Sequence, residues 1–239
     1  MKLTPALVLL LAAGSPLPAQ LITNLDTFDD GTTSGWFVGD ASHPTPPTNI
    51  ATGGPAGAGD NYLQLQAING SQLGSRLSVL NGSQWAGNYL SSGITGLRMD
   101  VKNFGPDDLH LRLLFEDFAG AGPPANLALS KVAVIVPAGS EWQSVSFALT
   151  PDALIPGIFG SVAGALASVD VLRLFHNIDA VFPGPGLGPA PVTAVLGVDN
   201  ITAFTPVPEP ATYLAGVALV GGCVLAWRRR RLAPSQSPT

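Results

Sequence analysis

The chain has 239 residues, a length that allows one domain or at most two. Hydrophobic residues make up 46% of it and charged residues only 11%, against roughly 25% charged in an average globular chain, which excludes coiled coils and long helical bundles. With 28 glycines and 22 prolines, we expect a packed core that is interrupted by many turns. The net charge of −5 argues against nucleic-acid binding, because phosphate contacts need clustered lysine and arginine.

Residues 1–19 have the features of a secretory signal peptide. A basic second residue precedes an apolar run over residues 6–13, and a stretch of small residues and prolines ends at Ala19. We expect cleavage after Ala19, and the alternative is an earlier cut near Ala13 or Gly14. The prolines in this segment argue against a buried first helix.

Residues 20–206 form the expected exported domain. It has six basic and fifteen acidic residues, a net charge of −9, and it has no cysteine because Cys223 is the only one in the chain. The domain must therefore rely on its core instead of on disulfides. Alternating apolar and polar residues predict strands over 62–66, 97–102, 109–113, 131–136, 142–149, 171–175 and 195–204. Only residues 160–167 have a weak helical pattern, so we predict an all-β fold, a single antiparallel β-sandwich.

A repeated tetrapeptide marks two turns. The sequence Asn-Gly-Ser-Gln occurs at residues 69–72 and again at residues 81–84. Because Asn-Gly is a strong signal for tight turns, we expect two successive hairpin turns here.

Short segments near both ends of this domain carry a resemblance to a known fold. Phe-Asp-Asp-Gly at 28–31, Gly-Trp at 35–36 and Gly-Val-Asp-Asn-Ile at 197–201 resemble the first and last strands of jelly-roll carbohydrate-binding modules and their relatives. The resemblance implies a jelly-roll-like sandwich in which the two terminal strands lie together. It also implies that an acidic residue from each of these strands helps to hold a structural calcium ion.

The candidate calcium ligands are Asp29, Asp30 and Asp199. Calcium takes six to eight oxygen ligands, and these carboxylates would supply part of that shell. The alternative is that Asp29 and Asp30 lie in a solvated turn and that Asp199 lies at a strand edge.

Aromatic residues are candidates for sugar binding, because an aromatic face packs well against the apolar face of a pyranose ring. Trp36 and Trp142 follow patterns that favour burial, whereas Trp85 and Tyr89 lie in a predicted loop and are expected to be exposed. Trp85 and Tyr89 are therefore the candidate ligand contacts, and the alternative is that all four residues belong to the core.

No catalytic residues are predicted. The three histidines are scattered along the chain, and neither a zinc-binding His-Glu-x-x-His, a Gly-x-Ser-x-Gly elbow nor a phosphate-binding loop occurs. The adjacent pairs Asp107-Asp108 and Glu116-Asp117 are expected to be solvated turn residues, because a glycosidase needs two carboxylates on either side of a cleft.

The C-terminal segment is typical of a membrane helix. Residues 211–227 carry no charge, and at 1.5 Å per residue a helix of this length is roughly 26 Å long, close to the hydrocarbon thickness of about 30 Å. Four arginines follow it and are expected to keep the C-terminus, with a polar tail at 233–239, on the cytoplasmic side. These are Arg228, Arg229, Arg230 and Arg231.

A proline-rich motif stands directly before this helix and consists of Val207, Pro208, Glu209 and Pro210. Together with the apolar helix and the arginine cluster, it resembles the PEP-CTERM sorting signal of Gram-negative bacteria over residues 207–232. The resemblance implies export across the inner membrane, membrane anchoring, and processing by an exosortase at or near the motif, which leads to the cell surface or exterior.

The predicted function is a structural or glycan-binding role in the extracellular polysaccharide matrix. The expected partners are an exosortase-type enzyme, the membrane and a polysaccharide, with no nucleic acid. The alternatives are a glycan-active hydrolase and a scaffold without a ligand.

Overall fold

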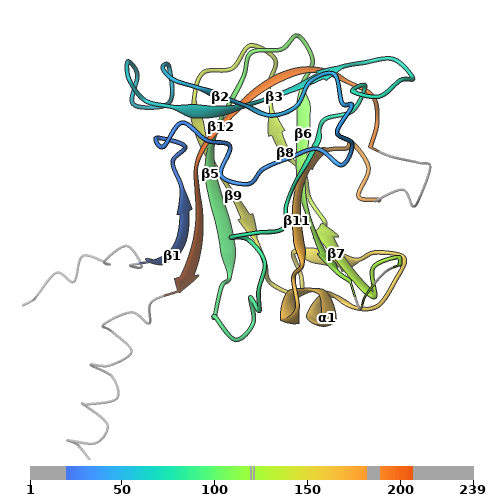
Figure 1. Ribbon diagram of the computed structural model, residues 1–239. Coiled ribbons are helices and arrows are strands. Elements are labelled where there is room, and N and C mark those ends of the chain that lie inside the picture. The colour runs from blue at the N-terminus through green and yellow to red at the C-terminus, as the bar shows by residue number, and fades with distance from the viewer. Residues whose placement is uncertain (1–19, 119, 121, 182–188, 207–239) are drawn as a thin grey trace, which may run out of the picture. The chain divides into compact units, whose positions relative to one another are not determined.

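The computed structural model describes residues 20–118, 120, 122–181 and 189–206 (Figure 1). The predicted signal peptide, sorting motif, transmembrane helix and arginine cluster lie outside these residues. Within the described ranges, no helix has the length and apolar character needed to cross a bilayer.

Two antiparallel sheets pack face to face (Figure 1). Sheet A has the order β2-β3-β12-β5-β9, and β1 also pairs with β12; its strands are β1 (Gln20–Asp26), β2 (Thr48–Ile50), β3 (Tyr62–Ile68), β5 (Gly96–Asn103), β9 (Gln143–Ala148) and β12 (Thr193–Pro206). Sheet B has the order β10-β7-β6-β11-β4, and β8 also pairs with β6; its strands are β4 (Ser78–Asn81), β6 (Leu109–Asp117), β7 (Asn126–Ser130), β8 (Val134–Val136), β10 (Leu154–Pro156) and β11 (Val171–His176). The predicted β-sandwich is confirmed, and the first and last strands are paired as the jelly-roll resemblance implies.

The period-two pattern placed most strands correctly. Strands β3, β5, β6, β9, β11 and β12 overlap the predicted segments, and helix α1 (Val162–Ala167) lies in the predicted helical window with Ser161 as its N-cap. The predicted strand over 131–136 is confirmed only in its second half, because β7 ends at Ser130 and β8 covers Val134–Val136.

The core lies between the sheets and consists of the apolar positions of each alternation. These side chains are at most 1% exposed, as in Leu63, Leu65, Met99, Val101, Leu111, Leu113, Leu174, Leu196 and Val198. A core of this extent explains how a domain without cysteine can be stable.

Neither Asn-Gly segment forms a hairpin turn, and Asn81 is the last residue of β4. Asn69 and Gly70 have φ values of 58° and 91°, the left-handed conformation that Asn-Gly favours. The strands on either side, β3 and β4, nevertheless belong to different sheets, so this turn carries the chain across the sandwich. The prediction of successive hairpins is therefore wrong, because turn chemistry alone does not determine which strands pair.

The outer face of β6 is also covered, which the alternation did not predict. Arg112 is 4% exposed, and its guanidinium donates hydrogen bonds to the backbone oxygens of Ser130, Lys131, Asn177 and Ile178 at 2.8–3.0 Å. This buried cation ties the ends of β7 and β11 to the centre of sheet B.

Replacing Arg112 with methionine should lower the free energy of unfolding by about 3 kcal/mol or more, because several buried carbonyl oxygens lose their donor. Urea denaturation would measure the change, and Arg98→Met, at an exposed position of β5, is the matched control. Equal effects of the two substitutions would show that the buried contacts of Arg112 add nothing to stability.

Candidate functional site

The structure buries the two aromatic residues that were expected to be exposed. Trp85 is 0% and Tyr89 3% exposed, so the prediction that they form a sugar-stacking surface is wrong for this fold. The Tyr89 hydroxyl donates to the backbone oxygen of Trp85 at 2.9 Å, and the Tyr89 ring packs edge-on against Phe115. Burial also raises the pKa of Tyr89 above its ordinary value.

A buried carboxylate explains the position of Trp85. Asp26 Oδ2 accepts hydrogen bonds from the indole Nε1 of Trp85 at 2.8 Å and of Trp36 at 3.0 Å, and Gln84 Nε2 reaches Asp26 Oδ1 at 3.0 Å. Trp36 is 2% exposed, which confirms its predicted burial. Both indoles are thus core residues that an acidic side chain of β1 holds in place.

The third tryptophan of the domain belongs to an aromatic cluster on the outer face of sheet A. Trp142 directly precedes β9 and is only partly buried, contrary to the prediction of burial. Its ring centroid lies 5.3 Å from that of Tyr62 and 6.4 Å from that of Phe104, and the two latter rings are 6.0 Å apart. Tyr62 is 6% exposed and lies beneath the other two, whereas Phe104 is 43% exposed.

Glycine at position 197 leaves room for these rings. A Cβ atom added to Gly197 in β12 would lie 2.8 Å from Cη2 of Trp142 and 3.1 Å from Cε2 of Phe104. Any larger residue at this position would therefore displace the rings, so the central strand of sheet A is the floor of the cluster.

Polar groups surround the cluster. Lys102 Nζ lies 5.1 Å from the centroid of Phe104 and forms an ion pair with Glu141 at 2.8 Å. Trp142 Nε1 donates to the backbone oxygen of Gly53 at 2.9 Å, which fixes the orientation of the indole. The arrangement combines exposed aromatic surface with hydrogen-bonding groups, which is the composition that sugar rings with apolar faces and hydroxyl edges require.

The alternation pattern carries a signal for this cluster. Tyr62 has the same parity as the outward-facing Gln64 and Gln66, and Phe104 has the same parity as Lys102. Trp142 likewise shares its parity with the exposed Ser144 and Ser146. In each case an aromatic residue occupies a position that belongs to the polar face.

The three predicted calcium ligands do not form one set. Asp29 and Asp30 are exposed, and the Asp30 carboxylate accepts hydrogen bonds from the backbone N–H and the hydroxyl of Thr32, which lower the pKa of Asp30. Across the described ranges, no three acidic, histidine or cysteine side chains gather closely enough to hold a metal ion. The calcium site therefore stays a prediction.

Asp199 is a buried residue of β12, a central strand of sheet A, and does not lie at a strand edge. It is 1% exposed at a β-bulge of β12, and its Oδ1 accepts from the backbone N–H of Asn200 at 2.7 Å. Burial raises the pKa of Asp199 to about 7; the Asn200 hydrogen bond opposes this shift, and the charges of Asp60, Asp100 and Asp29 add to it.

The residues of the two adjacent acidic pairs have hydrogen-bond or ion-pair partners within the fold. Asp107 and Asp108 accept backbone hydrogen bonds from Thr193 and Ala138 and lie in exposed turns, as expected. Glu116 is instead 3% exposed within β6 and pairs with Arg173 at 2.7 Å, so it is not a solvated turn residue.

Two of the histidines, distant in sequence, lie together. The rings of His110 and His176 are 6.0 Å apart, and Nδ1 of His176 accepts the backbone N–H of His110 at 2.9 Å. Burial lowers the pKa of His176 to about 4; the charge of His110 contributes to this shift, and that of Asp107 opposes it.

Comparison with known proteins defines the fold class. No protein-family model matches the chain, and no curated protein matches it at a significant level. Among solved structures, an exo-β-agarase has a TM-score of 0.52 at 13% identity over 79% of this chain, which spans only 25% of the agarase. The family 11 carbohydrate-binding module of a cellulosomal cellulase of Clostridium thermocellum has a TM-score of 0.51 at 14% identity, and the match covers 80% of this chain and 98% of the module.

A second structure of a family 11 module from Clostridium thermocellum, in complex with a β-1,3-1,4-mixed-linked tetrasaccharide, has a TM-score of 0.50 at 12% identity over 80% of this chain and 98% of the module. At such identities the likeness concerns the fold alone. The chain is a jelly-roll-like β-sandwich with the fold of carbohydrate-binding modules.

The lowered pKa of His176 predicts that its own contribution to stability is lost in acid. The folded pKa of about 4 lies below the ordinary value of 6.5, so this contribution to stability is complete above pH 6.5 and is lost as the pH falls towards 4. In His176→Asn, whose amide oxygen can still accept the His110 N–H, urea midpoints should depend less on pH over this window. An identical pH profile for wild type and variant would contradict the assignment.

The calcium hypothesis predicts thermal stabilisation. At a Ca²⁺ concentration about 100 times the dissociation constant, binding to the folded state adds about 2.7 kcal/mol and should raise the Tm by roughly 5–10 °C over the value with a chelator. Asp199→Asn should abolish the increase. No increase in the wild type, or an equal one in the variant, would exclude a calcium site that uses Asp199.

Proposed function

We propose that residues 20–206 bind a polysaccharide through the outer face of sheet A, without transforming it. The observation that carries this proposal is the aromatic cluster of Tyr62, Phe104 and Trp142, of which Phe104 has 43% of its surface exposed. The fold shared with carbohydrate-binding modules supports the proposal.

The geometry of the cluster suits a pyranose ring. Phe104 and Trp142 are inclined at 89°, so a sugar can pack its apolar face on one ring while the edge of the other lies beside it. Lys102 and Glu141 stand next to Phe104 and can hydrogen-bond to sugar hydroxyl groups. Tyr62 supports both exposed rings from below, so the surface is formed before a ligand arrives.

The cellular location of this function is inferred from the sequences of the two terminal segments. In the same proposal, the signal peptide at 1–19 exports the chain, the segment at 207–232 anchors it until an exosortase acts, and the domain has a structural or binding role in the extracellular polysaccharide matrix. The excess of acidic residues in the domain and the absence of cysteine are compatible with that setting.

Binding of a β-1,3-1,4-linked glucan tetrasaccharide, measured by isothermal titration calorimetry, tests the proposal. Phe104→Ala should weaken binding about tenfold, because the sugar loses one stacking surface. Phe159→Ala, at a phenylalanine that is 38% exposed in another part of the fold, is the matched control and should leave the affinity unchanged.

Absence of binding to this and to other neutral glucans would contradict the proposal. So would an equal loss in the Phe104 and Phe159 variants, because a general loss of stability would then explain both.

A further inference from the structure

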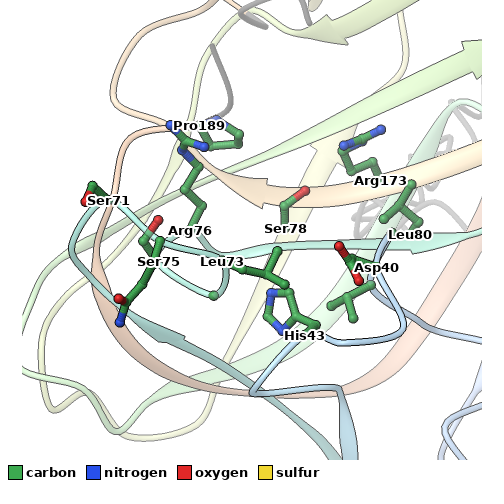
Figure 2. Close-up of a pocket in the computed structure, with 14 residues that line it drawn as sticks. Asp40, His43, Ser71, Leu73, Ser75, Arg76, Ser78, Leu80, Arg173 and Pro189 are labelled. Carbon is green, nitrogen blue, oxygen red and sulfur yellow. The ribbon is translucent and has the colours of Figure 1, made fainter. Parts of the chain in front are cut away.

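A pocket of about 450 Å³ opens on the outer face of sheet B (Figure 2). The aromatic cluster lies on the outer face of sheet A, on the other side of the sandwich. The floor of the pocket is the edge strand β4 with its neighbour β11, and its walls are the segments around residues 38–43 and 71–76. The volume lies within the roughly 300–1,000 Å³ of small-molecule sites, and no part of the proposed glucan surface contributes to it.

The floor contains a buried hydroxyl group without a partner. Ser78 Oγ is inaccessible, and among the described residues nothing hydrogen-bonds to it. It is the only buried side-chain nitrogen or oxygen of the described chain in this condition. A buried polar group in a native structure normally has a partner, so an unpaired hydroxyl in the floor of a pocket points to a ligand group.

Two of the six basic residues of the domain line this pocket, and Figure 2 shows them on either side of Ser78. Arg76 is exposed, and its guanidinium makes no hydrogen bond or ion pair within the described part of the chain. Arg173 donates to Glu116 through Nε at 2.8 Å and Nη2 at 2.7 Å, which fixes the direction of its side chain. Because Glu116 neutralises Arg173, Arg76 supplies the positive charge that favours an anionic ligand group in a domain with a net charge of −9.

The remaining polar groups suit a sugar instead of a bare ion. His43 Nδ1 accepts the backbone N–H of Thr45 at 3.2 Å, so Nε2 carries the proton and can donate. Asp40 accepts from the backbone N–H and hydroxyl of Ser42 at 2.8 and 2.7 Å and retains acceptor capacity for a ligand hydroxyl. A carboxylate acceptor next to arginine donors matches a ligand that bears both hydroxyl groups and an anionic group.

Apolar side chains complete the walls. Leu73, Leu80 and Val38 also line the pocket and offer surface to the C–H groups of a ring. Neither a small inorganic anion nor a flat hydrophobic molecule would use all three kinds of group.

We propose that this pocket binds a uronate residue of an acidic polysaccharide. Its carboxylate is bound by Arg76 and, once the Ser78 side chain rotates towards the pocket, by the Ser78 hydroxyl. Asp40 and His43 contact ring hydroxyl groups, and the leucines pack against the ring. The protein then has two carbohydrate sites on opposite faces, one for a neutral glucan and one for an acidic sugar. The second site does not depend on the first.

The test compares cellobiouronic acid with cellobiose, two disaccharides that differ only in the carboxylate, by calorimetry on the full-length protein. We expect the acid to bind at least about tenfold more tightly, since a charge-assisted hydrogen bond contributes at least that factor. Arg76→Gln should remove this preference, while Arg98→Gln, the same change at an exposed position of β5, should retain it.

Ser78→Ala separates a binding role from a structural one. Because the hydroxyl has no partner in the described fold, its removal should leave the Tm unchanged or higher while the affinity for cellobiouronic acid falls. A lower Tm in this variant would show that the hydroxyl serves the fold instead of a ligand.

Equal affinity for the two disaccharides, binding of neither, or equal losses in the two arginine variants would overturn the proposal. If inorganic sulfate competes for the pocket with an affinity equal to that of cellobiouronic acid, the pocket is a general anion site and not a uronate site. Phe104→Ala should not change binding of cellobiouronic acid, and Arg76→Gln should not change binding of the neutral tetrasaccharide. Failure of one site is therefore distinguishable from failure of the other.

Discussion

The Asp26 carboxylate is the contact around which the two buried tryptophans of the domain are arranged. It lies at the end of β1, is 6% exposed, and accepts the indole N–H groups of Trp36 and Trp85. These two donors come from segments 10 and 59 residues away, so one side chain holds the first strand, the loop after it and the loop after β4 together. Buried indoles need an acceptor, and a domain without disulfides gains long-range order from such a network.

This network also determines which aromatic residues remain available for binding. Since Trp36 and Trp85 are enclosed in the core, Trp142 is the one tryptophan of the described chain that reaches the surface. Its neighbour Tyr62 lies in β3 and its neighbour Phe104 directly follows β5, and Gly197 leaves room for the rings of Phe104 and Trp142. The proposed binding surface is therefore a property of the assembled sheet and not of any one segment.

The sequence was sufficient to predict the fold class, because alternation of apolar and polar residues depends only on local order. Leu97–Lys102 and Leu109–Leu113 illustrate this, and both lie in strands as expected. Trp85 and Tyr89 were misjudged because glycine and asparagine between them indicate a loop, whereas their burial depends on Asp26 and Phe115, which are remote in sequence. The burial of Arg112 has no signal in the sequence for a related reason, since alternation identifies the outer face of a strand but not what later segments place upon it.

The candidate site had a partial signal in the sequence. Parity along three strands places Tyr62, Phe104 and Trp142 on outward positions, and this can be read without a structure. The proximity of the three strands cannot be read from the sequence, because long-range pairing sets the order β3-β12-β5-β9. The pocket on sheet B had no local signal at all, since Arg76, Ser78 and Arg173 are unremarkable until β4 pairs with β11.

The most direct test of sugar recognition on sheet A is an NMR titration of the ¹⁵N-labelled full-length protein with the neutral β-1,3-1,4-linked glucan tetrasaccharide. The indole N–H resonances of Trp36, Trp85 and Trp142 report separately on the buried network and on the surface cluster. Binding at the cluster predicts that the Trp142 signal shifts with ligand concentration while those of Trp36 and Trp85 stay in place. Shifts confined to Trp36 or Trp85, or no shift of Trp142 at saturating ligand, would contradict it.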